Sequence, residues 1–428
     1  MVSNKKNNNE PMYSWAKDLF PITRSITGPG VRETLNYLKN IVPNLIIKKV
    51  KSGEKYFDWK VPDEWFPKEA WVKNQKGKKV IDFKKNNLHL VGYSKSIKKT
   101  MRLNELKKNL YSLASQPNAI PYVTSYYNKQ WGFCLKENDK KKLKNEKYDV
   151  FIDAPFKKGF LNYGEIIIRG KLKKEIFLST YICHPSLANN EISGPVVAIA
   201  LSKWIKKIKN RKYTYRIVFL PETIGSIIYI SKNLNKLKKN VIAGFNITCV
   251  GDTRCYSYIP SRNEDTLADK VSLNILKFVD PKFKKYSWLD RGSDERQYCA
   301  PGIDLPVVTI CRSKFGTYPE YHTSLDNLNL ISSKGLETSL SLIKKIILSI
   351  ENNQIPKSKI LCEPQMGRRK MYPTLSIKNN YQESKTIMDI ISYCDGKNDL
   401  IDISNKLNIS VFEIYKIIKI LKIKKIIT

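Results

Sequence analysis

The chain has 428 residues, of which 42% are hydrophobic. This is enough apolar material to build folded cores, so wholesale disorder is excluded. Lys and Arg outnumber Asp and Glu by 76 to 39, which gives a formal net charge of +37. That charge is compatible with a nucleic acid or another anionic polymer as partner. The lysines are spread along the chain rather than gathered in one segment, which favours compositional bias over a dedicated binding surface.

The cysteines and the N-terminus bear on the compartment. Eight cysteines form no CxxC pair and no dense framework, a pattern that favours free thiols in a reducing compartment. The first residues, MVSNKKNNNEPMYSW, lack the apolar core of a signal peptide. No stretch approaches the ~20 apolar residues of a membrane span, so we expect no membrane insertion. These features together predict a soluble, cytoplasmic protein.

The N-terminal third of the chain changes character near residue 51. A loop, FPITRSITGPG, precedes the helical pattern VRETLNYLKNIV within residues 1–50. Residues 51–140 then carry short aromatic and β-branched runs between turn residues, which predict a small inserted antiparallel β domain. These runs are YFDWKV, AWVKN, KVIDF, LHLVGY and the strand pair expected in TSYYNKQWGFCL.

Beyond the insertion, apolar strand patterns alternate with helical ones. Runs such as EIFLSTYIC, YRIVFLP, NVIAGFNITCVG and DLPVVTIC read as strands, and GPVVAIALSKWIKKI reads as a helix. This alternation predicts an α/β domain, formed by residues 1–50 and 141–352, with a mostly parallel mixed sheet flanked by helices. Ligands of such sheets bind beyond the carboxyl ends of the strands.

A linker rich in Pro, Lys and Asn is expected at 353–380, followed by a compact helical domain at 381–428. Its three helical runs, SKTIMDIISYC, DLIDISNKLN and SVFEIYKIIKILKIKKI, predict a winged helix-turn-helix-like unit. Ser410 and Glu413 have the spacing of a capping box before the third helix. The unit serves either DNA binding or, as we favour, packing or dimerisation.

Two of the three histidines stand where catalytic groups are expected. His184 directly follows a buried strand, and His322 lies in the late loop GTYPEYHTSLDN, whereas His89 lies in the insertion and is interpreted as a structural or surface residue. Glu222 and Asp252 also follow apolar strands. Neutral imidazoles and carboxylates are the ligands that zinc prefers in open catalytic sites.

Five stretches now make the chain resemble a known family. In order along the chain, they are FPITRSITGPG, ICHPSLANNEISGP, PETIGS, GSDERQY and YHTSLDN. They resemble the co-catalytic zinc aminopeptidases, and most of all the bacterial subgroup called polysaccharide-biosynthesis proteins with an aminopeptidase-like domain. The resemblance covers residues 12–50 and 148–350 and implies a zinc-exopeptidase (phosphorylase/hydrolase-like) fold. The β insertion and the C-terminal winged helix match the subgroup's architecture.

The resemblance implies roles for three residues. His184 matches the first metal-binding histidine, and His322 in YHT-x-x-D matches the last one. Glu222 matches the general base, while Thr223 takes the place of a metal-binding glutamate of the family.

The family's bridging aspartate falls on Asn190, and Glu191 beside it is a candidate replacement. Asp252 is a substitute for the family's later metal-binding aspartate, which falls near Thr248. A neutral Asn190 does not offset the repulsion of two metal ions as a carboxylate does. We therefore expect one Zn²⁺ ion, held by ligands drawn from His184, Asn190, Glu191, Asp252 and His322, and leave a second ion open.

Four further residues are candidates for substrate binding. The guanidinium groups of Arg24 and Arg291 suit a carboxylate or phosphate. Asp294 or Glu295 suits a free amino group. The resulting hypothesis is an aminopeptidase-like, metal-dependent hydrolase of an amide bond. Its substrate would be a small peptide, or an amide-bearing glycan or aminoacyl conjugate of surface-polysaccharide biosynthesis. The alternatives are a catalytically inactive binding or scaffold protein and a DNA-binding regulator, and a homodimer is left open.

Overall fold

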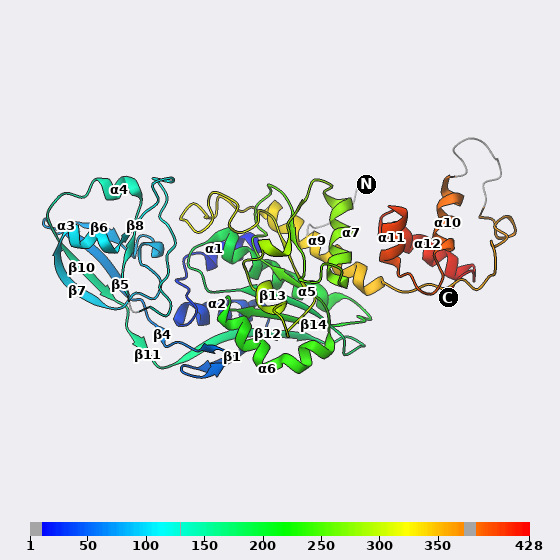
Figure 1. Ribbon diagram of the computed structural model, residues 1–428, viewed down its shortest axis with the longest axis horizontal. Helices are drawn as coiled ribbons and strands as arrows, with labels where there is room; N and C mark the ends of the chain where they lie inside the picture. Colours follow the sequence, from blue (N-terminus) through cyan, green and yellow to red (C-terminus); the bar gives the residue numbers. More distant parts are fainter. Residues whose placement is uncertain (1–10, 129, 372–381) are drawn as a thin grey trace, which may run out of the picture. The chain divides into compact units, whose positions relative to one another are not determined.

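The computed structural model describes residues 11–128, 130–371 and 382–428 (Figure 1). Internal contacts divide the described chain into two compact units. The first comprises the residues up to 264 together with 284–340, and the second comprises 265–283 and 341–428. Each unit is described by itself.

The first unit is built on an eight-stranded mixed sheet, with strands in the order β1-β12-β14-β13-β15-β18-β16-β17. Its four central strands, β14, β13, β15 and β18, run parallel to one another. β1 and β12 add antiparallel pairs at one side. The bounds are β1 Ile46–Lys51, β12 Phe160–Ile168, β13 Glu175–Tyr181, β14 Thr214–Leu220, β15 Val241–Ile247, β16 Ser257–Ile259, β17 Lys284–Lys285 and β18 Val307–Cys311.

The central strands are mostly apolar because both faces of the sheet are covered. Every residue of β13, β14 and β18 is buried, as expected for parallel strands between two layers of helices. Helix α5 packs against β12, β13, β14 and β15, and α6 packs against β15. The predicted mixed sheet flanked by helices is thus confirmed. The helices of this unit's α/β part are α1 Met12–Leu19, α2 Pro29–Ile41, α5 Ser193–Lys207, α6 Ile224–Asn240 and α8 Glu295–Tyr298.

The inserted segment forms its own small β structure. Four antiparallel strands lie in the order β6-β5-β10-β7, and alternate residues such as Val72 and Val150 point into a core. Strand β10 lies beyond residue 140, where the insertion was expected to end, because its alternating pattern, KYDVFID, completes this sheet. The strands are β2 Lys55–Tyr56, β3 Trp59–Lys60, β4 Glu64–Trp65, β5 Glu69–Asn74, β6 Lys79–Asp82, β7 Ile97–Arg102, β8 Leu110–Tyr111, β9 Phe133–Cys134, β10 Lys147–Asp153 and β11 Phe156–Lys157, with short helices α3 Leu103–Leu106 and α4 Glu137–Lys141.

Two expected strands of the insertion are wrong. LHLVGY begins in a 3₁₀ turn, Asn87–His89, because the Asn86 side chain accepts the Leu88 N–H and caps it. In TSYYNKQWGFCL, the structure describes a strand only at Phe133–Cys134. Tyr126 has a φ of +36°, which breaks an extended run before it can pair. His89 is held structurally, with Nδ1 at 2.7 Å from the carbonyl oxygen of Cys134.

The second unit contains the helices α10 Gln382–Ser392, α11 Leu400–Leu407 and α12 Val411–Ile423. Helix α7, Leu267–Val279, joins it from the middle of the sequence, and its Asn274 Nδ2 donates to Ser404 Oγ at 2.7 Å. The capping box expected at Ser410 is wrong, since that side chain makes no capping hydrogen bond. A capping box forms instead between Asp399 and Asp402 at the start of α11. Helix α9, Ser333–Asn352, contributes its residues from 341 onward.

Among the described residues, no helix is long and apolar enough to cross a membrane.

Candidate functional site

A pocket of 390 Å³ lies where the loops after β13 and β14 meet the inserted β structure. This volume is within the ~300–1,000 Å³ typical of small-molecule sites. The loops bring His184 and Glu222 to it, as expected for the carboxyl ends of parallel strands. The lining residues are Ile26, Trp59, Tyr122, Thr124, Tyr126, Tyr127, His184, Glu222, Thr223, Ile224, Arg296 and His322.

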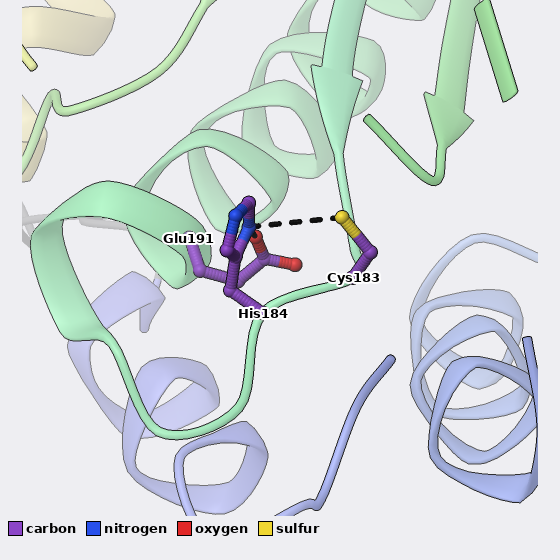
Figure 2. Close-up of side chains that lie close together, drawn as sticks. All are labelled: Cys183, His184 and Glu191. Atoms are coloured by element: carbon purple, nitrogen blue, oxygen red, sulfur yellow. Dashed lines mark hydrogen bonds and ion pairs between the residues drawn. The ribbon is translucent and has the colours of Figure 1, made fainter. Parts of the chain in front are cut away.

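The His184 ring is buried and held in one orientation (Figure 2). Its Nδ1 lies 2.7 Å from Glu191 Oε2, and its carbonyl oxygen accepts a 2.9 Å hydrogen bond from Arg24 Nε. The carboxylate fixes the hydrogen on Nδ1, which leaves Nε2 as the free ring nitrogen. That nitrogen lies 3.6 Å from Glu222 Oε2. Burial lowers the pKa of His184, but Cys183, Tyr122 and Glu191 raise it, and the net shift is upward, so a metal ion bound at Nε2 would have to displace a proton.

A π-helical turn, Ala188–Ile192, delivers Glu191 to His184. Such turns are rare and are frequent at functional sites. Asp326 stabilises the turn, because its carboxylate accepts the backbone N–H groups of Asn189 and Asn190 at 2.6 and 3.0 Å. The turn rotates Glu191 toward His184, while the side chain of Asn190 donates to the Tyr181 hydroxyl at 2.7 Å.

Glu222 stands on a strained turn between β14 and α6. The N–H of Ile224 donates to the carbonyl of Glu222 at 2.8 Å, and Thr223 between them has φ +64° and ψ −76°. This is a γ-turn of the rare, strained hand, and a β-branched residue makes it costlier. Thr223 is held by its N–H to Asp294 Oδ1 at 2.8 Å and by Arg296 Nη2 on its hydroxyl at 2.6 Å. Burial raises the pKa of Glu222.

His322 approaches the same pocket from the loop after β18. Its φ is +54°, and its ring stacks on Tyr321 with centroids 3.9 Å apart. The His184 and His322 ring centroids are 5.4 Å apart. Burial, followed by the charge of His184, lowers the pKa of His322 to about 3, so this ring is neutral. Its buried Nε2 has no hydrogen-bond partner among the described residues.

Tyr122, from the inserted β structure, contacts both histidines. Its ring meets His184 and His322 edge-on, with centroids 5.3 and 5.1 Å away. Its N–H donates to the His322 carbonyl at 2.8 Å, and Pro121 pairs with Thr323 in an antiparallel bridge. The sequence reasoning missed this residue, because nothing in the local pattern links the insertion to a loop 200 residues later.

Asp252 does not line the pocket. Its carboxylate accepts hydrogen bonds from Asn189 Nδ2 and from the N–H and hydroxyl of Ser313, at 2.9 to 3.1 Å. It also accepts the N–H of Arg254. These four donors occupy the oxygens of Asp252, so this side chain joins loops rather than facing His184.

The loop at 291–296 contributes one lining residue, Arg296. Glu295 is buried and accepts from the Gly292 and Ser293 N–H groups and from Asn246 and Thr309. Asp294 is buried beneath Glu222, and burial followed by the charge of Glu222 raises its pKa to about 8.

Both arginines expected to bind substrate lie outside the pocket. Arg291 is exposed, with its guanidinium 5.0 Å from the Trp288 ring centroid. Arg24 is 2% exposed and is held by the carbonyl groups of His184 and Leu19.

Two sets of side chains that include His184 are candidate ligands for a metal ion. Cys183, His184 and Glu191 place ligand atoms within 4.8 Å of one another. However, the 2.7 Å contact between His184 Nδ1 and Glu191 is a hydrogen bond that leaves no room for an ion. Burial raises the pKa of Cys183 to about 11, so the thiol is protonated.

The other set has the donor chemistry of a zinc site. His184, Glu222 and His322 line one pocket, and imidazole with carboxylate is a typical catalytic zinc donor set. Among the described residues, the ligand atoms of this set do not all lie within 4.8 Å of one another, as those of the first set do. Asn190 Oδ1 and Glu191 Oε1 are also buried without hydrogen-bond partners.

This fold is similar to that of solved aminopeptidases. A zinc aminopeptidase from Bacillus subtilis, 13% identical, superposes with a TM-score of 0.59 over 79% of this chain and 94% of that one. An aminopeptidase from Aneurinibacillus, also 13% identical, gives 0.52 over 81% and 94%. At this identity the likeness concerns the fold alone.

The chain belongs to the family described as a domain of unknown function, DUF4910, which matches residues 13–353. A winged helix-turn-helix matches residues 354–428 and confirms the predicted C-terminal fold. A Clostridium acetobutylicum protein described as a polysaccharide biosynthesis protein with aminopeptidase-like domain is 43% identical, over 95% of this chain and 93% of that one. A crystal structure described as a peptidase from the same organism is 40% identical, with a TM-score of 0.91 over 98% and 96%.

Proposed function

We propose that this protein is an aminopeptidase-like hydrolase that uses zinc to cleave an amide bond. One observation carries the proposal. His184, Glu222 and His322 line the same pocket, His184 Nε2 lies 3.6 Å from Glu222 Oε2, and the buried Nε2 of His322 has no hydrogen-bond partner among the described residues. A buried imidazole held neutral with no hydrogen-bond partner is costly unless it has a ligand.

His184 and His322 would hold the ion, with Glu222 beside them and Glu191 orienting His184 from behind. A bound zinc ion would polarise the substrate carbonyl and lower the pKa of a water molecule. Glu222 takes a proton from the attacking water and passes it to the leaving amine. Its upward-shifted pKa suits both halves of that transfer. Asn190, Glu191 and Asp252 are not assigned as ligands in this proposal.

The substrate is a small peptide or an amide-bearing aminoacyl or glycan conjugate. The relative from Clostridium acetobutylicum, named for polysaccharide biosynthesis, supports a glycan-linked setting. We place the reaction in the cytoplasm. The absence of disulfides among the cysteines, all of which lie in the described residues, supports this location.

The test is a zinc measurement with a matched histidine control. Protein purified without added metal is analysed by mass spectrometry and titrated with zinc by calorimetry. We expect His184→Ala and His322→Gln to lose zinc binding, whereas His89→Gln, outside the pocket, keeps it. Cleavage is followed with alanine and leucine p-nitroanilides and with aminoacyl amides. Absence of zinc in the wild type, with unchanged ligand binding in His184→Ala, would favour a non-catalytic binding protein.

For the C-terminal unit, the second candidate function is packing or dimerisation. Ile420 and Ile423 on α12 are 44% and 69% exposed, between the exposed lysines 419, 422 and 424. Apolar side chains within a basic face favour a protein partner over a duplex. Light scattering of wild type and of Ile420→Ser/Ile423→Ser tests this. Steeply salt-dependent duplex binding that is lost on deletion of residues 381–428 would instead support DNA binding.

A further inference from the structure

A second pocket, of 420 Å³, lies beside the candidate active site. Trp59 lines both pockets. The second pocket is mostly apolar, and its side-chain hydrogen-bonding groups are those of Asp58 and Gln297 and the indole N–H of Trp59. Its lining residues are Phe57, Asp58, Trp59, Ile227, Ile230, Gln297, Ala300, Pro301, Gly302 and Ile303.

The same two helices, α6 and α8, line both pockets. Helix α6 contributes Ile224 to the first pocket and Ile227 to the second, one turn further along. Helix α8 contributes Arg296 to the first and Gln297 to the second. A ligand that lies along these helices therefore reaches both pockets and passes Trp59.

The wall of the second pocket is a hairpin of the inserted segment. Strands β2 and β3 are joined by Phe57 and Asp58, and Phe57 has a φ of +51° with 59% of its surface exposed. A bulky residue in this conformation at an exposed tip is costly, since glycine or asparagine fits such turns best. The hairpin rests on α6, with Lys232 Nζ 5.2 Å from the Tyr56 ring centroid. The chain thus tolerates strain to keep an aromatic ring at the rim of this pocket.

We propose that the second pocket is a substrate subsite that takes an aliphatic or aromatic side chain of a peptide-like substrate. This side chain belongs to the residue that follows the cleaved amide. The inference rests on the proposed function, because it places that amide beside Glu222. A sugar ring brings several hydroxyl groups that each need a partner when buried. This pocket offers hydrogen-bonding groups on Asp58, Trp59 and Gln297 against six wholly apolar side chains, so it favours an apolar occupant.

The test compares three probes that share an N-terminal alanine. Alanyl-glycinamide lacks a second side chain, alanyl-leucinamide carries an aliphatic one, and N-alanyl-glucosamine carries a sugar. Dissociation constants are measured by calorimetry in zinc-containing buffer with Glu222→Gln, in which hydrolysis is expected to be arrested. Hydrolysis of the same probes is measured with the wild type.

We expect alanyl-leucinamide to bind about tenfold or more tighter than alanyl-glycinamide, the effect of burying one leucine side chain. Adding Phe57→Ala, an exposed site whose loss spares the core, should remove most of this preference and leave the affinity for alanyl-glycinamide unchanged. Ala300→Phe, which fills the pocket, should do the same. The control is Phe278→Ala, which removes another exposed phenylalanine, on α7 and outside the pocket. This variant should keep the preference for alanyl-leucinamide.

Equal affinities for the two peptides, no binding by any probe, or tighter binding of N-alanyl-glucosamine would overturn the subsite. Failure of the proposed function looks different. If the leucine preference appears and depends on Phe57, but the wild type cleaves none of the probes, the subsite stands and the hydrolase is refuted. If the peptides are cleaved without any leucine preference, the hydrolase stands and the subsite is refuted.

Discussion

The backbone N–H of Tyr122 donates to the carbonyl oxygen of His322 at 2.8 Å, so the inserted β structure braces the loop that carries the second histidine. The neighbouring contacts are of the same kind. Ser324 N–H donates to the Ile120 carbonyl, and Ile120 N–H donates to Ser324 Oγ at 3.0 Å. His322 is held in a left-handed conformation that a free loop would adopt only at a cost. The insertion is therefore part of the candidate site rather than an appendage.

This brace leads to a prediction for Tyr122→Ala. The substitution removes the ring that packs edge-on against both imidazoles, and we expect zinc affinity to fall by about tenfold or more, as when supporting contacts of a metal site are lost. The measurement is a competition titration against a chelator. Tyr127→Ala removes a half-exposed tyrosine of the same pocket that contacts neither histidine, and should leave the affinity unchanged. Equal losses in both variants would show that the brace does not matter.

Glu191 and Glu222 are predicted to separate metal binding from turnover. Glu191→Gln removes the charge that holds the Nδ1 hydrogen of His184, and zinc affinity should fall by about 10–100-fold. Glu222→Gln should retain zinc and lower kcat by about 10²–10⁴-fold, because the proton carrier is lost. Calorimetry and steady-state kinetics on both variants measure the two effects. A Glu222→Gln protein that no longer binds zinc would make Glu222 primarily a ligand.

The parts of the site that the sequence could predict are those set by strand ends. His184 and Glu222 follow fully buried runs, and parallel strands bring their carboxyl ends together whatever the loops do. Asp252 also follows a strand, β15, yet Ser313 and Asn189 engage its carboxylate elsewhere. Position after a strand therefore predicts the neighbourhood of a side chain but not its direction.

Features that depend on contacts between distant segments were not predictable. The π-helical turn that aims Glu191 at His184 depends on Asp326, and Tyr122 reaches His322 from the insertion. Arg24 was predicted to bind substrate, but its guanidinium is buried and donates to the backbone carbonyl of His184. Helix α7 joins the second unit through Asn274 and Ser404, a pairing that no local periodicity encodes.

Thr223 allows a direct measurement of strain at the site. Its φ of +64° is costly for a β-branched residue, by about 1–3 kcal/mol, and costs glycine nothing comparable. We expect Thr223→Gly to be about 1 kcal/mol more stable than Thr223→Ala, the reverse of the usual order of these residues. Urea unfolding of the two variants measures this, since both lack the hydroxyl that accepts from Arg296. An alanine variant as stable as the glycine variant would exclude strain. If the strain aims Glu222, the glycine variant should also turn over more slowly.

The last prediction concerns a cluster of buried charged side chains on one face of the sheet, from strands β12, β13 and β14. Arg216, 1% exposed, donates to Glu165 at 2.7 Å and to Glu175 at 2.6 and 2.8 Å. Arg216→Met removes the guanidinium that holds the buried Glu175 and leaves Glu165 with Lys48 and Tyr229, and we expect a loss of about 3–5 kcal/mol in the free energy of unfolding at neutral pH. Lys48→Met removes the half-exposed partner of Glu165 and should cost about 1 kcal/mol or less.

The pH dependence of this cluster gives an independent check. Burial raises the pKa of Glu165. Hydrogen bonds from Lys48 and Tyr229 and the charges of Lys48 and Arg216 lower this pKa by a larger amount, so the net shift is downward. A carboxyl whose folded pKa is depressed stabilises the fold above its unfolded pKa, and this contribution is lost as the pH falls through the folded pKa. In Arg216→Met, the charge of Arg216 no longer lowers the pKa of Glu165, so less of this stabilisation is present to be lost on acidification. The difference in unfolding free energy between wild type and Arg216→Met should therefore shrink as the pH is lowered from 7 toward about 4. Urea midpoints across that range measure it, and a pH-independent difference would mean that lost packing, not charge, accounts for the destabilisation.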